Sequence, residues 1–208
     1  FPRPAAVLDF LYHPKAAFWF DHHPTTFLRE EWRKNFKSTK FCRFDPKYLS
    51  CCSLVLDALV RDFKFRPPKH FRELARWGDV IDSAGYRSAR QWAELKEPAS
   101  KISVYIDSLR GAPEIASIVH LFRTMPLAAM VRLPKIRAAL RRILAKQRRI
   151  LAFYRENLAV TDGVAFIDLA STAFGRLNAA PYYLRPKILY SVSITRKSKE
   201  IFHLNVAV

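Results

Sequence analysis

The chain has 208 residues, half of them hydrophobic, and carries a formal net charge of +18. This apolar content excludes a disordered chain, and no apolar run reaches the roughly 18 residues that a membrane helix needs. Such an excess of Lys and Arg favours polyanionic partners such as nucleic acid, nucleotides or phosphates, although an Arg-rich source organism would explain the charge equally well.

The three cysteines, Cys42, Cys51 and Cys52, form a poor disulfide framework because their number is odd and two of them are adjacent. The absence of a Cys-x-x-Cys spacing also argues against a thiolate metal site. The first residues lack the charged start and apolar block of a signal peptide, so we expect reduced thiols in a cytoplasmic protein. Because the chain opens with Phe1 rather than Met, we expect residues to be missing before it.

Two short apolar segments, Ala5–Asp9 and Ala16–Phe20, are predicted to be buried strands whose C-terminal tips carry polar groups. Ligand sites of open α/β sheets gather at such tips. The polar and basic stretch from Thr25 to Lys47 predicts a loop with one helical turn around Phe27–Asn35.

A run of helices follows, separated by breaks that contain Pro or Gly. The predicted helices are Ser53–Phe63, His70–Ser83, Ser88–Lys96, Ala99–Leu109 and Glu114–Arg123. Lys135–Asn157 has the most regular 3.6-residue period, which predicts a long connecting helix. The remaining positions of this helix are strongly basic, and they are better explained as a solvated surface than as a contact with nucleic acid.

The last part of the chain changes to a strand pattern. Gly163–Leu169, Ile188–Thr195 and Ile201–Val208 are predicted strands, and Arg196–Lys199 is a predicted hairpin turn. We therefore expect a small α/β unit that begins near Ala159 and is incomplete, because it stops on a strand.

Three side chains that can bind metal, Asp21, His22 and His23, directly follow the second predicted strand. Carboxylate oxygens and neutral imidazole nitrogens are ligands that Mn²⁺, Mg²⁺ and Zn²⁺ accept. Because successive side chains alternate along a strand, one histidine is expected to bind metal while the other faces a substrate phosphate. A lone Asp or His here would be read as a turn residue, but a solvated turn rarely needs two histidines.

Two more carboxylates can join this site. Asp9 ends the first predicted strand, although such an aspartate is more often a turn residue. Asp82 ends the apolar stripe of His70–Ser83, and we prefer it to Asp79 because Ser83-Ala84-Gly85 lets the backbone turn sharply after it. Isolated histidines are predicted to be packing or surface residues: His13, His70, His120 and His203.

The stretch Val7–Phe10, followed by Trp19–Thr25, resembles the second and third motifs of the DHH-superfamily phosphoesterases. This superfamily includes RecJ-type exonucleases, oligoribonucleases, cyclic-dinucleotide phosphodiesterases, exopolyphosphatases and family II pyrophosphatases. The resemblance implies an α/β fold with a parallel-sheet catalytic domain over residues 1–134, a linking helix over 135–158 and a partial substrate-binding domain over 159–208.

The resemblance also implies residue roles and a cofactor. Asp9, His22 and Asp82 would be metal ligands, His23 would contact the scissile phosphate, and Asp21 would support the histidines. Members of the superfamily usually bind two Mn²⁺ ions, and Mg²⁺ is an alternative. Two ions would clamp the phosphate and activate a bridging water.

This sequence departs from the superfamily pattern in three places. The first motif, of the type Asp-x-Asp-Gly, is absent and is expected upstream of Phe1. The Gly-Gly-Gly-His segment is also absent and is expected beyond Val208. In addition, only Phe10–Lys15 separates the two predicted strands, whereas a parallel crossover usually needs about a dozen residues. A very short crossover or an altered strand order is therefore expected. Because the metal ligands of the first motif are missing, we also expect little or no turnover by this chain alone.

The predicted function is metal-dependent hydrolysis of phosphodiester or phosphoanhydride bonds in oligonucleotides, nucleotides or polyphosphates. Two other classes stay open: a non-catalytic or degenerate nucleic-acid-binding fragment, and a purely structural basic helical protein. The hydrolase requires that His22, Asp9 and Asp82 meet within metal-ligand distance, with open space beside them. The structural protein requires that His22 and His23 have no carboxylate neighbours.

Overall fold

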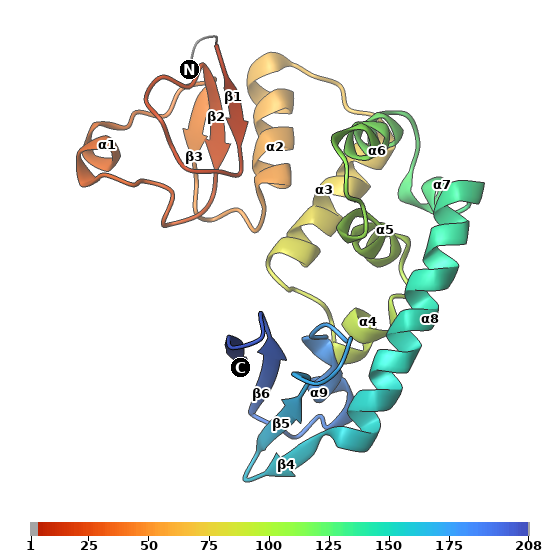
Figure 1. Cartoon of the computed structure of the whole chain (residues 1–208). Coiled ribbons are helices and arrows are strands. Elements are labelled where there is room, and N and C mark those ends of the chain that lie inside the picture. The colour runs from red at the N-terminus through yellow and green to blue at the C-terminus, as the bar shows by residue number, and fades with distance from the viewer. Residues whose placement is uncertain (1–3, 208) are drawn as a thin grey trace. The chain divides into compact units, whose positions relative to one another are not determined.

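The computed structural model describes residues 4–207, which form two compact units (Figure 1). Unit 1 contains the chain up to Gly85 together with Ile115–Ala129. Unit 2 contains Tyr86–Glu114 and the chain from Met130 onward. The division of the chain into a catalytic domain, a linking helix and a substrate-binding domain stays a prediction.

Unit 1 combines a small sheet with helices. Its elements are β1 (Ala6–Leu8), β2 (Phe18–Asp21), α1 (Glu30–Asn35), β3 (Cys42–Phe44), α2 (Cys51–Phe63) and α3 (Lys69–Asp82), with most of α6 (Ala112–Thr124) and α7 (Leu127–Met130). The two predicted strands and the helices after them are confirmed. The loop predicted between Thr25 and Lys47 is wrong at β3, because three residues are too few to show a period in the sequence.

The three strands are parallel and stand in the order β1-β2-β3, as the expected α/β fold requires. Residues 9–17 connect β1 to β2 without a helix, so the very short crossover is confirmed. Two hydrogen bonds shape this connection: Trp19 Nε1 donates to Phe10 O at 2.8 Å, and Tyr12 N donates to Thr26 O at 3.0 Å. Because the strands are parallel, the carboxyl ends of β1 and β2 lie at the same edge of the sheet.

Each face of this sheet has its own apolar layer. Phe20, which is fully buried, packs against Leu54 and Ala58 of α2. On the opposite face the Trp19 ring lies 4.8 Å from the Tyr12 ring and belongs to an aromatic cluster that replaces a covering helix. Burying one such aromatic or aliphatic side chain contributes about 1.5 to 3 kcal/mol, so the end of β2 is held firmly from both sides.

Helices α2 and α3 pack closely against each other. Ser50 caps α2, because its side chain accepts a hydrogen bond from Ser53 N, which satisfies one of the free N–H groups of the first turn. Gly78 allows the close approach, since a Cβ atom at this position would lie 3.0 Å from Cys52 Cβ. The last turn of α3, which carries Asp82, is thereby held beside the start of α2.

Unit 2 contains the second sheet and the longest helix. Its elements are α4 (Ala89–Glu94), α5 (Pro98–Asp107), α8 (Pro134–Asn157), β4 (Ala159–Thr161), β5 (Val164–Asp168), α9 (Ala179–Leu184), β6 (Tyr190–Arg196) and β7 (Phe202–Ala207). The predicted long helix, the three strands and the hairpin are confirmed. Strand β4 and helix α9 were not predicted, because both are short and lack a clear apolar period.

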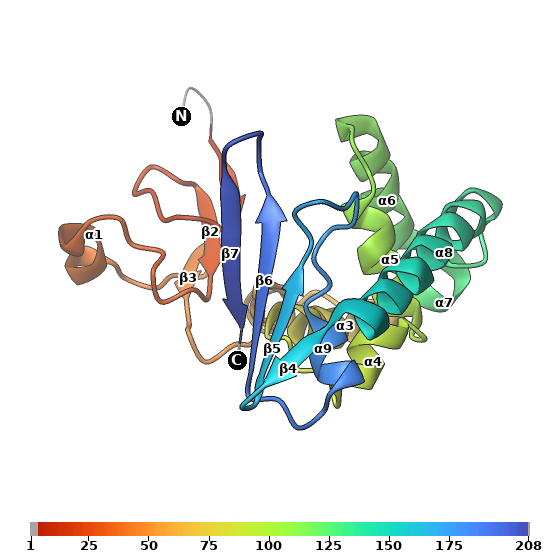
Figure 2. The same ribbon diagram turned by 60° about the horizontal axis from the view of Figure 1, so that its bottom comes forward.

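The sheet of unit 2 has the order β4-β5-β6-β7 (Figure 2). Strand β6 is parallel to β5 and antiparallel to β7. One face of the sheet packs against α8 and α9 through a core that includes Tyr154, Ala165 and Ile167, all at most 1% exposed. Among residues 4–207, no helix has the length and hydropathy to cross a membrane.

Candidate active site

The Asp21 carboxylate, at the end of β2, organises the turn that carries both histidines. This carboxylate is 1% exposed. Its Oδ1 accepts from His22 N at 2.7 Å, His23 N at 3.0 Å and His23 Nδ1 at 2.7 Å, and its Oδ2 accepts from Thr26 Oγ1 at 2.5 Å. Since both oxygens are engaged, Asp21 is a positioning residue for His22 and His23. Sequence reasoning missed Thr26, because a threonine in a turn carries no distinguishing signal.

The His22 ring has one nitrogen engaged and one free. Its Nδ1 lies 3.0 Å from Tyr48 O, and a carbonyl can only accept, so Nδ1 carries a hydrogen. In the neutral ring Nε2 then presents a lone pair, which is the form that binds metal ions. His22 Nε2 is buried and has no hydrogen-bond partner among the described residues. An orphaned buried nitrogen is costly unless a proton or a cation meets it.

Two carboxylates face this nitrogen. Asp82 Oδ2 lies 3.0 Å and Asp9 Oδ1 lies 3.5 Å from His22 Nε2. Two atoms that are each about 2.1 Å from a divalent ion are about 3.0 Å apart at a right angle and about 3.4 Å apart at a tetrahedral angle. The spacing of each of these two His–Asp pairs therefore fits a shared divalent cation, and Asp9 and Asp82 both lie beside His22.

The backbone and the charge of Asp9 both indicate a specialised position. Its φ of 56° lies in the left-handed region, which aspartate adopts more readily than most residues. Burial raises the pKa of the Asp9 carboxyl, and the negative charge of Asp82 raises it further. Crowded carboxylates of this kind are stabilised by a cation between them.

His23 is placed differently from His22. Its Nδ1 donates to Asp21, and 48% of its side chain is exposed. The hydrogen bond to Asp21 raises the pKa of His23, which favours the imidazolium form. The two rings lie side by side with centroids 4.4 Å apart, so the expected alternation is wrong here, because β2 ends at Asp21.

Another group of four side chains is also close enough to share an ion: Asp9, Asp21, His22 and His23 offer ligand atoms within 4.8 Å of one another. We favour Asp82 over Asp21 as a ligand, because the oxygens of Asp21 already accept hydrogen bonds. Asp79, the competitor of Asp82, accepts from Ser50 Oγ at 2.6 Å and Ser53 Oγ at 2.7 Å. The ligand role of Asp82 stays a prediction.

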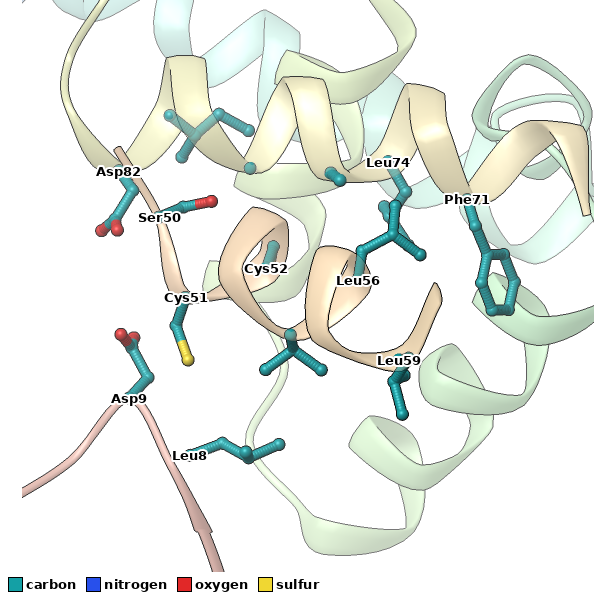
Figure 3. Close-up of a pocket in the computed structure, with 14 residues that line it drawn as sticks. Leu8, Asp9, Ser50, Cys51, Cys52, Leu56, Leu59, Phe71, Leu74 and Asp82 are labelled. Carbon is teal, nitrogen blue, oxygen red and sulfur yellow. The ribbon is translucent and has the colours of Figure 1, made fainter. Parts of the chain in front are cut away.

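Open space lies beside the cluster. A cavity of about 500 Å³ extends along β1, α2 and α3, and Asp9 and Asp82 line it together with a mostly apolar wall (Figure 3). Cys51 and Cys52 also line this cavity. Burial raises the pKa of Cys51 to about 12 and also raises that of Cys52, so both remain thiols near neutral pH and are poor metal ligands.

Comparison with known proteins complements this geometry. No family model and no curated protein matches the chain. Among solved structures, the chain is similar to the pGpG-specific phosphodiesterase PggH from Vibrio cholerae, with a TM-score of 0.72 over 97% of this chain and 68% of that chain. The chain therefore shares its fold with this structure. The sequence identity is 13%, so the similarity concerns the fold.

Proposed function

We propose that this chain provides the metal centre of a phosphoesterase that hydrolyses a phosphodiester or phosphoanhydride bond of a nucleotide or short oligonucleotide. One observation carries the proposal: the free Nε2 of His22 faces carboxylate oxygens of Asp9 and Asp82 at 3.5 and 3.0 Å. The fold shared with PggH and the resemblance of Val7–Phe10 and Trp19–Thr25 to DHH motifs support it.

In this proposal, different residues bind the metal and the substrate. Asp9, His22 and Asp82 would hold a divalent cation, Mn²⁺ in our proposal, with a second ion expected by the DHH resemblance. A bound ion of this kind activates water and neutralises charge on the phosphate. Tyr48 O fixes the His22 ring, and thereby keeps its Nε2 lone pair directed at the cation site.

His23 is proposed to contact the scissile phosphate. Asp21 holds Nδ1 of this ring, which leaves the Nε2 hydrogen of the imidazolium available for a phosphate oxygen. Because the pKa of His23 is raised, this donor stays protonated to a higher pH than an ordinary histidine would. A charged donor binds a phosphate oxygen more strongly than a neutral one.

The proposed substrate class is a dinucleotide or short oligonucleotide. PggH is described as pGpG-specific, and the net charge of +18 suits a polyanionic ligand. Pyrophosphate and polyphosphate are the competing substrates. A polyanion that contacts many basic residues should bind with a steep salt dependence, whereas pyrophosphate should show a shallow one.

The first test measures Mn²⁺ binding to the 208-residue chain by calorimetry. We expect binding by the wild type and its loss in His22→Ala. His120→Ala, which removes an exposed histidine of the same unit, is the matched control and should bind as the wild type does. A wild-type chain that binds no Mn²⁺, or a His22→Ala variant that binds it equally well, would contradict the proposal.

The second test measures Mn²⁺-dependent hydrolysis by the protein. Substrates are pGpG, cyclic dinucleotides, short oligoribonucleotides and pyrophosphate, again with His22→Ala and His120→Ala. Hydrolysis that survives His22→Ala would refute the assignment. Binding of oligonucleotides without any hydrolysis would instead support the non-catalytic binding module.

A further inference from the structure

We propose that unit 2 contains a binding site for one phosphate group of the substrate, built by Tyr154, Arg176, Ser191 and Ser193. The site is a small recess between the inner face of β6 and β7, the end of α8 and the segment before α9. The identification of the ligand as a substrate phosphate rests on the function proposed above. The recess itself is independent of that function.

Two serine side chains line this recess. Ser191 and Ser193 are 9% and 7% exposed, and both line the space. Neither hydroxyl makes a hydrogen bond to any residue in the described part of the chain. Neither hydroxyl oxygen is fully enclosed by the protein, so both are open to the space of the recess. Such groups normally meet water or a ligand.

The placement of these serines runs against the local sequence pattern. The alternation Ser191-Val192-Ser193-Ile194 predicts serines that face solvent and apolar residues that face the core. The structure has the reverse arrangement, because both serines lie on the buried face. Conflicts between local pattern and fold concentrate at functional sites.

A third hydroxyl converges on the same recess. The Tyr154 side chain is fully buried, and its oxygen accepts from Leu177 N at 3.2 Å. No acceptor for its own hydrogen exists among residues 4–207. The recess is therefore lined by three O–H donors whose hydrogens have no partner, which suits an oxygen atom that only accepts.

The charge of the residues that line the recess favours an anionic ligand. Arg176, an exposed residue, provides a guanidinium, and the residues described around the recess include no Asp or Glu. Asn205 also lines it, and its Nδ2 contacts its acceptors only at 3.4 to 3.5 Å, so this donor is weakly held. Hydroxyls and a guanidinium together are the donors that bind phosphate in proteins.

The size of the recess defines how the ligand enters. The enclosed space accommodates about one water-sized group. We therefore place one phosphate oxygen inside, against the hydroxyls of Tyr154, Ser191 and Ser193, with the rest of the phosphate at the opening beside Arg176. An ordered water would satisfy the hydroxyls equally well, but it would not need the guanidinium.

The test titrates the ¹⁵N-labelled 208-residue chain with inorganic phosphate and, separately, with pGpG, followed by NMR. We expect amide shifts at Arg176, Ser191 and Ser193. The double variant Ser191→Ala/Ser193→Ala and the variant Arg176→Ala should each raise the phosphate Kd by about tenfold or more, and Arg176→Lys should raise it less. Arg185→Ala, an exposed arginine of the same unit, is the matched control and should leave the Kd unchanged.

Thermal unfolding and Mn²⁺ binding of the same variants distinguish a loss of the phosphate site from a loss of folding or of the metal site. Without phosphate, the double serine variant should unfold at about the same temperature as the wild type, because neither hydroxyl makes a hydrogen bond within the described part of the chain. Mn²⁺ binding should survive in the serine and Arg176 variants, and phosphate binding in this recess should survive in His22→Ala. Failure of Mn²⁺ binding alone would therefore overturn only the proposed function. Unchanged amides at Ser191 and Ser193, or a Kd unaffected by both variants, would mean that the recess holds water only.

Discussion

The cluster in unit 1 and the recess in unit 2 offer a ligand opposite chemistry. The cluster presents acceptors, namely the Nε2 lone pair of His22 and the carboxylate oxygens of Asp9 and Asp82 that lie beside it. The recess directs donors at one point, the hydroxyls of Ser191 and Ser193 beside Arg176. The first suits a cation and the second suits an anion, and a metal-dependent phosphoesterase needs both.

This comparison shows that the polarity of a site is decided locally. The chain has twice as many basic as acidic residues, yet Asp9, Asp21 and Asp82 lie near His22 where β1, β2 and α3 end. At separations of 3 to 4 Å, a few neighbouring groups outweigh distant surface charges, because solvent and salt screen the latter. The net charge favours association with polyanions and says nothing about where a cation binds.

The largest expected effect concerns the choice between Asp82 and Asp79. We expect Asp82→Asn to weaken Mn²⁺ binding by at least about 100-fold, because it removes the charge of a carboxylate that we propose as a ligand and that lies 3.0 Å from His22 Nε2. The matched variant Asp79→Asn should change the Mn²⁺ affinity by no more than about threefold, since Asp79 binds serine hydroxyls instead. Calorimetric titration measures both, and equal losses would remove the distinction between the two aspartates.

The next effect tests the buried anchor of the cluster. Asp21→Asn should lower the free energy of unfolding by about 2 to 4 kcal/mol, because an amide cannot accept all the hydrogen bonds that the carboxylate accepts. Asp45→Asn, at a turn where one oxygen accepts from Lys47 N, should change it by less than about 0.5 kcal/mol. Urea unfolding followed by circular dichroism compares them. Asp21→Asn should leave phosphate binding in unit 2 intact.

A smaller effect tests the close packing that positions Asp82. Gly78→Ala should destabilise the chain by about 1 to 2 kcal/mol, because the new Cβ atom would lie 3.0 Å from Cys52 Cβ and force α2 and α3 apart. Gly175→Ala is the control, since a Cβ there meets nothing within 4 Å. Thermal unfolding measures the difference. A stabilised Gly78→Ala would show that helix propensity outweighs the contact.

The smallest effect is a pH dependence at His23. Its pKa is raised above the ordinary value of 6.5, chiefly by the hydrogen bond to Asp21. The stabilising contribution of this imidazolium is therefore complete below pH 6.5 and is lost as the pH rises through the raised pKa. Because about half of the side chain is exposed, solvent reduces the effect. NMR titration of metal-free protein should give a lower pKa in Asp21→Asn, and an unchanged pKa would contradict the role of Asp21.

Regular segments were predictable because periodicity is a local property. Helices α2, α3 and α8 and strands β5, β6 and β7 each repeat an apolar pattern over enough residues to be seen. Strand β3, which contains three residues, forms because β2 offers it a partner along Trp19–Asp21. That partner comes from tertiary structure, so no window of sequence around β3 could reveal it.

The sequence by itself determined that Asp21, His22 and His23 would stand at the tip of a buried strand, because a contiguous triplet moves as one piece with its strand. Only the tertiary structure decided which carboxylates join them and that Ser191 and Ser193 turn inward. Those outcomes depend on packing between different elements, such as α3 on α2 and the sheet on α8 through β5. Such packing follows from the shape and burial of whole elements, which no local pattern records.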